Sequence, residues 1–214
     1  FGTHAKQQAV PGYPGVVDQN IDVAELLQRA VDHLGHLGGV GDVGKQRQAL
    51  AAQGCVAVTV DPRGVGQSGP APSRRIDYGL DAFLERDWPA VTNWARERYP
   101  GRPLVLLGHS LGGMVSALYA GLAPEGVDGL VLLTTSHVHY RHWPRPVGWL
   151  VWGNFVAFAT LARLLGYFPG QRLGWGSPIA RQLVIDWARW GTTGRYRSPS
   201  GDDVDGLLAR VALP

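Results

Sequence analysis

Short apolar runs alternate with longer segments of helical spacing along the middle of the chain. The runs are rich in β-branched and leucine residues, as is typical of buried strands in a parallel sheet. They cover residues 55–60, 103–108 and 129–135. Apolar residues recur at helical intervals over residues 78–99 and 113–122, and we expect Pro89 to kink or restart the first helix. This alternation predicts an open, mostly parallel, doubly wound α/β sheet with right-handed crossovers.

Glycine and proline separate the other segments of the N-terminal half. Residues 1–20 have an irregular pattern. Residues 35–44 and 61–72 are rich in glycine or proline and predict loops. Helical spacing of apolar residues predicts helices over residues 22–34 and 45–53.

The composition changes after Tyr140, where tryptophan becomes frequent. Six of the eight tryptophans lie between residues 143 and 190, and helical spacing covers residues 147–165 and 178–190. We expect a helical cap over the sheet edge, with most of these tryptophans in its own core and others lining an apolar pocket. The apolar stretch 147–162 is shorter than the ~20 residues of a bilayer span, so it predicts a buried or membrane-surface helix and no transmembrane span.

These patterns divide the chain into four parts. The parts are an atypical N-terminal segment at 1–45, an α/β core at 46–140, a helical cap at 141–200 and a return to the core at 201–214. Ligands of open α/β sheets bind beyond the carboxyl ends of the strands. Asp61, Ser110 and Ser136 follow predicted strands, so this edge of the sheet is where we expect a site.

Charge and cysteine content narrow the function classes. The formal net charge is +3, and the arginines after residue 140 are scattered without a tight basic run, which argues against a nucleic-acid partner. Cys55 is the only cysteine, so an intrachain disulfide is excluded. Residues 1–20 lack the apolar segment of a secretory signal. We therefore expect a cytoplasmic globular protein with a small-molecule ligand.

The sequence Gly108-His109-Ser110-Leu111-Gly112 lies between a predicted strand and a predicted helix. A serine with glycine two residues away on both sides, in this context, is typical of a nucleophile elbow. The tight turn strains the serine backbone, and we expect a Cβ at residue 108 or 112 to collide with the neighbouring strand or helix. The N–H of Leu111, at the start of the helix, is then placed to bind an oxyanion.

Two motifs resemble those of the α/β-hydrolase family. Residues 58–68 resemble its strand and Asp-x-Arg-Gly-x-Gly-x-Ser loop, in which we expect Asp61 and Arg63 to make local hydrogen bonds. Residues 108–113 resemble its Gly-His-Ser-x-Gly-Gly turn. A bacterial subgroup of the family, most of it without an established substrate, is similar to this chain over about residues 46–214. The segments that carry this closer resemblance are 140–144, 164–170 and 187–190.

The resemblance implies a triad of serine, acid and histidine in that order along the chain. Ser110 is the implied nucleophile, and the Leu111 N–H is one oxyanion donor. The other elbow residues are Gly108, His109, Gly112 and Gly113, with His109 pointing away from the catalytic face. Residues 210–214 resemble the start of the strand that precedes the acid, so the acid and the histidine are expected beyond Pro214, in a chain that is truncated.

Other polar residues offer alternatives within the chain. The histidines that follow a predicted strand at the same edge are His137, His139 and His142. Exposed loop histidines are usually inert, and geometry is the first requirement of a base. A solvated loop is expected for Asp202, Asp203 and Asp205. No metal-ligand spacing is visible, and the expected chemistry needs no metal or organic cofactor.

The glycine-rich segment before the core admits two interpretations. Gly39 and Val40 are candidates for a second oxyanion loop. Alternatively, Gly39, Gly41 and Gly44 fit a dinucleotide fingerprint, and with Lys45 they nearly form a phosphate-binding loop, although Gln46 replaces the required serine or threonine. Both nucleotide motifs need a preceding strand, and residues 31–37 are a poor one.

These observations predict a serine hydrolase that cleaves an ester or related acyl bond through an acyl-enzyme on Ser110. We expect the substrate to be apolar and this chain to have little or no turnover. The alternatives are a non-catalytic binding or scaffold protein on a hydrolase fold and, third, a dinucleotide-binding protein.

Overall fold

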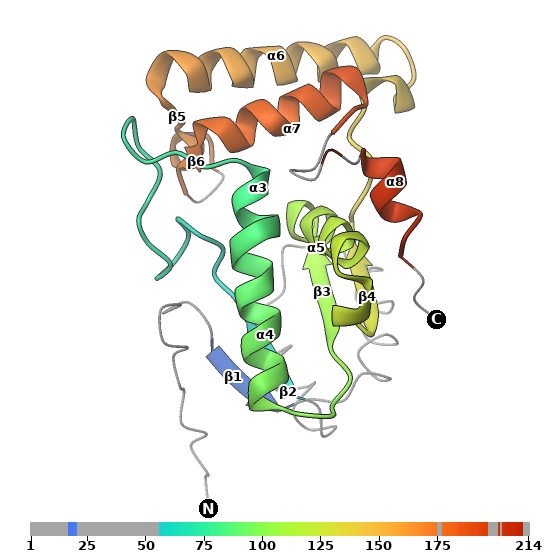
Figure 1. The fold of residues 1–214 in the computed structure, drawn as a ribbon. Coiled ribbons are helices and arrows are strands. Elements are labelled where there is room, and N and C mark those ends of the chain that lie inside the picture. The colour runs from blue at the N-terminus through green and yellow to red at the C-terminus, as the bar shows by residue number, and fades with distance from the viewer. Residues whose placement is uncertain (1–16, 21–55, 175–176, 197–200, 202, 212–214) are drawn as a thin grey trace, which may run out of the picture. The chain divides into compact units, whose positions relative to one another are not determined.

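The computed structural model describes the chain in five stretches. They are residues 17–20, 56–174, 177–196, 201 and 203–211. The chain divides into two units, one of Phe1–Pro62 with Gly66–Ser68 and one of Arg63–Val65 with Gly69–Pro214. Figure 1 shows the elements of both units. The predicted helices over 22–34 and 45–53, and the loop between them, lie outside the described residues.

In the first unit, two strands form an antiparallel pair. β1 (Val17–Asn20) pairs with β2 (Val56–Thr59), with Val17 opposite Thr59. β2 lies within the strand predicted over residues 55–60. β1 corrects the prediction that residues 1–20 are irregular. Its sequence is mostly polar, and it becomes a strand because β2 supplies hydrogen-bond partners that no local pattern reveals.

The turn after β2 is held by Asp61, as predicted. Asp61 Oδ2 accepts a hydrogen bond from the N–H of Gln67 at 3.1 Å. Gly66 has a φ of +55°, and a Cβ at this residue would lie 2.2 Å from Asp61 Oδ2. Only glycine therefore allows the loop to fold around the carboxylate.

In the second unit, a parallel pair of strands and the helix between them form the centre. β3 (Val105–His109) and β4 (Gly129–Leu133) are parallel, and α5 (Leu111–Leu122) connects them. These elements confirm the predicted strands and helix to within two residues at each end. The residues of α5 from Gly113 to Gly121 are all buried, which makes this helix the middle of the core.

The described strands occur as three pairs rather than as one mostly parallel sheet. β3 and β4 are parallel, whereas β1 and β2 are antiparallel, as are β5 (Tyr167–Phe168) and β6 (Ile179–Ala180). The prediction of an α/β fold with a parallel strand–helix–strand unit holds, and the antiparallel pairs were not predicted.

The helix predicted over residues 78–99 consists of three joined pieces. α3 (Leu80–Ala82) leads into a π-helical turn at Phe83–Asp87, and α4 (Trp88–Arg98) continues from it. Pro89 lies in the first turn of α4. Proline has no N–H, and its ring displaces the carbonyl one turn earlier, so a wider turn before it relieves the clash. The prediction that Pro89 restarts the helix is confirmed.

Arg63 reaches this π-helical turn and makes its ion pair there. Its Nε donates to Asp87 Oδ2 at 2.9 Å, and its Nη2 pairs with Asp87 Oδ1. Asp87 is buried, and a buried carboxylate requires a partner. Arg63 therefore also bonds to a residue outside its own loop, which the sequence did not predict.

Two long helices pack along each other on the side of the second unit toward which β3 points (Figure 1). α6 (Val147–Leu165) has the predicted bounds, and α7 (Arg181–Thr193) begins three residues after the predicted start because β6 occupies the residues before it. Each helix ends at a glycine in the left-handed region, Gly166 at φ 80° and Gly194 at φ 72°. These glycines act as the C-terminal stops of both helices.

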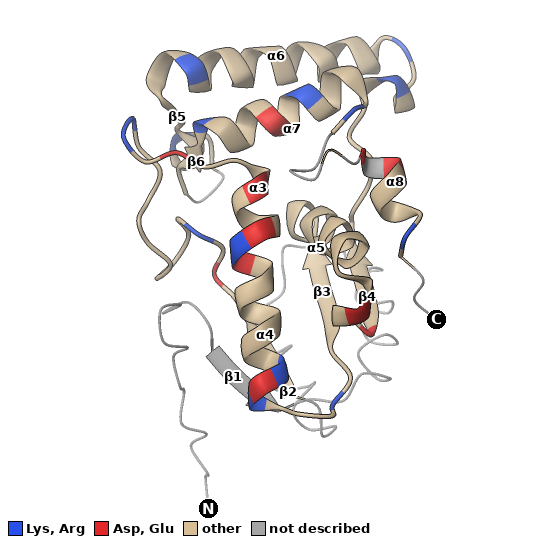
Figure 2. Cartoon of the chain, viewed as in Figure 1, with Lys and Arg blue, Asp and Glu red and all other residues tan. Residues whose placement is uncertain are grey.

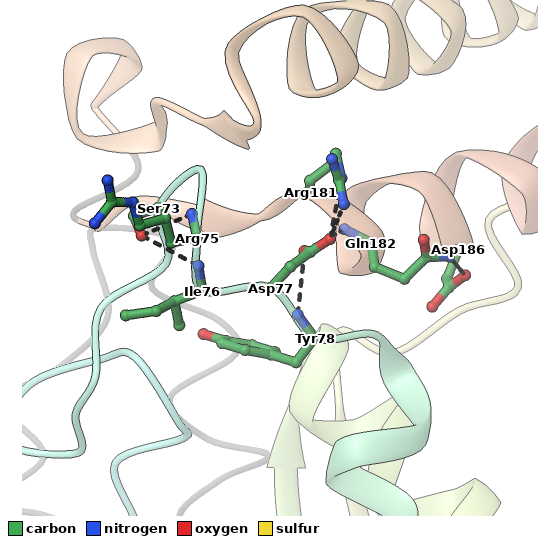
Figure 3. Close-up of polar contacts among 8 residues, drawn as sticks. All are labelled: Ser73, Arg75, Ile76, Asp77, Tyr78, Arg181, Gln182 and Asp186. Carbon is green, nitrogen blue, oxygen red and sulfur yellow. Dashed lines mark hydrogen bonds and ion pairs between the residues drawn. The ribbon is translucent and has the colours of Figure 1, made fainter.

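Two aspartates cap helices across the junction of α3 and α7. Figure 3 shows Asp77 at this junction together with Arg181 and Gln182. Asp77, just before α3, accepts from the N–H of Gln182 in the first turn of α7 at 2.8 Å. Asp186, on α7, accepts from the N–H of Leu80 at the start of α3 at 3.1 Å. Arg181 Nε adds a hydrogen bond to Asp77 Oδ2 at 3.0 Å. The two helix starts are thus held by side chains about a hundred residues away along the chain.

Asp203 and Asp205 are exposed as expected, but Asp205 lies in a helix rather than in a loop, and Asp202 lies outside the described residues. Asp203 Oδ1 accepts from the N–H of Gly206 at 2.7 Å and begins α8 (Val204–Leu208). Arg210 and Val211 continue this turn, because their N–H groups donate to carbonyl oxygens of α8. The strand expected over 210–214 is therefore absent at 210–211. Residues 212–214 lie outside the residues that the structure describes.

Candidate active site

Ser110 occupies the turn between β3 and α5. Its backbone has a φ of 51° and a ψ of −117°, a sparsely populated conformation that costs about 1–3 kcal/mol. The Ser110 N–H donates to the Leu133 carbonyl at 3.0 Å, so the strand ladder continues into the turn. The residue is exposed. The fold therefore presents a serine on a strained backbone at the carboxyl end of β3.

Two glycines make this turn sterically possible. A Cβ on Gly108 would lie 2.4 Å from the Gly113 nitrogen, and a Cβ on Gly113 would lie 2.0 Å from Thr135 Oγ1. At Gly112, by contrast, a Cβ would meet no described atom within 4 Å. The expectation for residue 112 is therefore wrong. Successive helix positions face different directions, and it is residue 113 that faces back toward the strand ends.

The first turn of α5 directs backbone N–H groups toward the region beside Ser110. The Met114 N–H donates to the Ser110 carbonyl at 3.1 Å and closes the first turn of the helix. The N–H groups before it, including that of Leu111, have no acceptor within the helix. These donors and the positive end of the helix dipole favour an anion at this position.

Thr134 and Thr135, at the end of β4, border the turn and were not predicted as site residues. Thr134 has a positive φ of 45°. Thr135 Oγ1 donates to the Leu133 carbonyl at 3.2 Å, and the Ser110 carbonyl lies 3.5 Å away. Only their place in the sequence could have indicated these threonines. They follow β4, which pairs in parallel with β3, the strand that leads to Ser110.

The histidines after β4 contact one another and α7. Trp190 Nε1 donates to His137 Nε2 at 3.0 Å, and the His139 N–H donates to His137 Nδ1 at 3.2 Å. A neutral imidazole has one acceptor nitrogen, so His137 satisfies one of these donors at a time. Burial, followed by the charge of His142, lowers the pKa of His137. Burial also lowers the pKa of His139. We find His109 exposed at the end of β3.

A complete triad is not formed by the described residues. Within these ranges, no hydrogen bond joins Ser110 Oγ to a histidine, and none joins a histidine to a carboxylate. Asp186 is used in helix capping, and burial raises its pKa. In the same part of the chain, no three His, Cys, Asp or Glu residues are close enough to hold a metal ion.

Several predicted site residues lie outside the described part of the chain. These are Gly39 and Val40 of the second oxyanion loop, and Gly41 and Gly44 of the dinucleotide fingerprint. Asp61 belongs to the first unit, whereas Ser110 belongs to the second.

Comparison with known families agrees with the strand, serine turn and helix seen here. A family model described as the alpha/beta hydrolase fold matches residues 9–176. The chain belongs to this family. The match covers most of the chain, including β2, the turn at Ser110 and β4. It also begins upstream of residue 46, within the segment 1–45 that the sequence motifs left unassigned. Because α/β-hydrolase fold proteins are in general hydrolytic enzymes, membership supports a hydrolase-type function for this chain.

Proposed function

We propose that this α/β-hydrolase fold protein is a serine hydrolase that cleaves an ester or a related acyl bond. The observation that carries the proposal is the backbone of Ser110, which is held at φ 51° with the residue exposed between β3 and α5. Strain of this kind persists only where the surrounding structure enforces it. A turn of this kind supports the proposal because it would present the Ser110 hydroxyl next to helix N–H donors, which is the arrangement that acyl transfer requires.

In the proposed reaction, Ser110 Oγ attacks the carbonyl carbon of the substrate and gives its proton to a base. The carbonyl oxygen becomes an oxyanion that accepts a hydrogen bond from the Leu111 N–H. The bond to the leaving group then breaks as the leaving oxygen takes up the proton, and an acyl-enzyme on Ser110 remains. Water hydrolyses this ester by the same steps, so no cofactor is consumed.

The base and the acid are proposed to come from residues beyond Pro214. The histidines in the described part of the chain support this placement. His137 is engaged by Trp190 and by the backbone of His139, so its ring nitrogens face donors other than Ser110. Without a base, a serine hydroxyl is a weak nucleophile, and we therefore propose little or no turnover by the 214-residue chain.

We propose that α6 and α7 form a cap over the site and favour an apolar acyl or alcohol group. Both helices lie on the side toward which β3 points, and aromatic side chains pack between them. Phe155 of α6 meets Trp187 of α7 with ring centroids 5.0 Å apart.

The proposal includes a cytoplasmic location, which rests on the sequence alone.

A fluorophosphonate probe tests the nucleophile. A chain that includes any residues the gene encodes after Pro214 is treated with the probe, and labelling is read by intact-protein mass. We expect a single adduct that Ser110→Ala abolishes. Ser136→Ala is the matched control, because Ser136 is also exposed and also follows a strand of the same pair.

Two results would contradict the proposal. An adduct that persists in Ser110→Ala would place the reactive group elsewhere. A lengthened chain that folds and takes no label would favour the scaffold function, in which the fold binds a ligand without chemistry.

A further inference from the structure

The outward side of α6 is mostly apolar. Leu150 and Leu164 are 67% and 74% exposed. With Ala157 they recur every seven residues, so they lie on one side of the helix. The other large apolar side chains exposed on this helix are Val147, Trp149, Trp152 and Val156. We call these residues, with Leu150, Ala157 and Leu164, the α6 face. Exposed apolar surface of this continuity marks an interaction site.

Of the five tryptophans that the structure describes between residues 143 and 190, three are exposed and Trp187 is partly buried against the core, which corrects the expectation that most of them are core residues. Trp175 lies outside the described residues. Trp149 and Trp152 belong to the α6 face, and Trp143 just before α6 is also exposed. Trp190 of α7 is buried as expected. Tryptophan has a large apolar ring with a polar N–H, which suits it to the boundary between hydrocarbon and water.

The opposite side of α6 is fixed against α7. Phe155, Ala159 and Ala162 are buried there. Gly191 of α7 admits the Phe155 ring, since a Cβ on this glycine would lie 2.2 Å from it. α6 is long and apolar enough to cross a membrane by length and composition alone. Because one side is occupied by α7, a position along a surface fits this helix better than a span.

The surroundings of the α6 face are positively charged. The sequence has no Asp or Glu between Asp128 and Asp186. Arginines within this interval are Arg141, Arg145, Arg163, Arg172 and Arg181. Arg141 and Arg145 precede α6, Arg163 lies in its last turn, and all three are exposed. Figure 2 shows α6 and its ends with basic residues and no acidic ones.

The exposed polar side chains of α6 are Asn154, Thr160 and Arg163. Thr160 Oγ1 donates to the Val156 carbonyl of its own helix at 2.8 Å. Arg163 has a long stem that can extend its charge toward headgroups while its methylene groups remain among apolar neighbours. The exposed side of the helix is thus compatible with partial burial among lipid chains.

We propose that the α6 face docks on the surface of an anionic lipid bilayer, with the helix lying in the plane of the membrane. Apolar side chains enter the headgroup boundary, and the arginines at both ends pair with lipid phosphates.

A second copy of the chain fits this surface less well. In a two-fold interface the same patch meets itself, and the arginines around it would then face arginines.

Sedimentation with vesicles tests the proposal. The full chain is mixed with vesicles of phosphatidylcholine alone, or of phosphatidylcholine with phosphatidylglycerol, and the bound fraction is measured. We expect binding to the vesicles that contain phosphatidylglycerol and weaker binding to the neutral ones. Leu150→Glu and Leu164→Glu should each lower the partition coefficient about tenfold or more, which equals ~1.4 kcal/mol.

The control substitution is Leu208→Glu, which adds the same charge at an exposed leucine of α8 and should leave binding unchanged. A combined Arg141→Gln, Arg145→Gln and Arg163→Gln variant should lose the preference for phosphatidylglycerol. The proposal is wrong if neither vesicle binds the folded chain, or if Leu150→Glu and Leu208→Glu behave alike. A dimer in sedimentation equilibrium that Leu164→Glu dissociates, without vesicle binding, would assign the face to a second copy instead.

Discussion

Ser110 combines a strained backbone with an exposed position, and its neighbours determine that combination. The sequence identified the turn because a glycine-flanked serine stood between an apolar run and a helical one. It did not identify which glycines are sterically required. That depends on how α5 is rotated against the strands, and the rotation places Gly113, not Gly112, next to Thr135. Likewise, the partner of Arg63 is 24 residues away, beyond the reach of a local motif.

Substitution of the two elbow glycines should give opposite changes in stability. In Gly108→Ala the new methyl group meets the Gly113 backbone at 2.4 Å, so we expect the free energy of unfolding to fall by about 1–3 kcal/mol. In Gly112→Ala the methyl group meets no described atom within 4 Å, and the helix gains up to ~1 kcal/mol because alanine restricts the unfolded chain. Urea unfolding followed by tryptophan fluorescence measures both. Equal destabilisation by the two variants would show that the turn is packed differently.

His137 should make the protein less stable in mild acid. Its pKa is lowered from 6.5 in the folded state, mainly by burial, so the unfolded chain binds a proton more readily. The free energy of unfolding should therefore fall as the pH decreases from 6.5 through the folded-state pKa. His137→Gln retains an acceptor for Trp190 and should have a flatter profile. The comparison variant is His109→Gln, at an exposed histidine. A wild-type slope retained in His137→Gln would assign the titration to other groups.

At the scale of elements, the ends of a helix or strand were predictable where nearby residues in the sequence determine them. α6 has the predicted ends because Pro146 precedes it and Gly166 stops it in the left-handed region. β1 and α8 were missed because their causes are not local. β1 depends on pairing with β2, and α8 packs against Gly121 of α5 through the backbone of Leu207. A short polar strand and a five-residue helix have too weak a pattern to be recognised without their partners.

The junction of α3 and α7 should depend on Asp77. Its carboxylate accepts the N–H of Gln182 in α7 and pairs with Arg181 (Figure 3). We expect Asp77→Ala to lower the free energy of unfolding by about 1–2 kcal/mol, as for the loss of a helix cap. Glu85→Ala is the control, because Glu85 is exposed on the π-helical turn. Chemical denaturation provides the measurement, and similar losses in both variants would mean that the capping bonds contribute little.

At the scale of the molecule, the family and the strand–helix–strand centre were accessible from sequence because they rest on contiguous motifs. The groups that should complete the site do not follow from any such motif, since a triad is assembled from distant segments of a fold. The α6 face illustrates the same difference. Its apolar residues were visible in the sequence, but which of them face outward became clear only from the packing of α6 on α7.

The last prediction concerns turnover by the whole chain. If Ser110 acts without a base, the Leu111 N–H and substrate binding are the remaining contributions, and hydrolysis of p-nitrophenyl butyrate should be close to that of Ser110→Ala. Addition of any residues that the gene encodes after Pro214 should raise kcat by about 10⁴–10⁶-fold, the range lost when triad members are removed from serine hydrolases. The control is the lengthened chain with Ser110→Ala, which should return to the background rate. Rapid turnover by the 214-residue chain that Ser110→Ala abolishes would mean that the base lies within it, and His137 and His142 would then be the first residues to substitute.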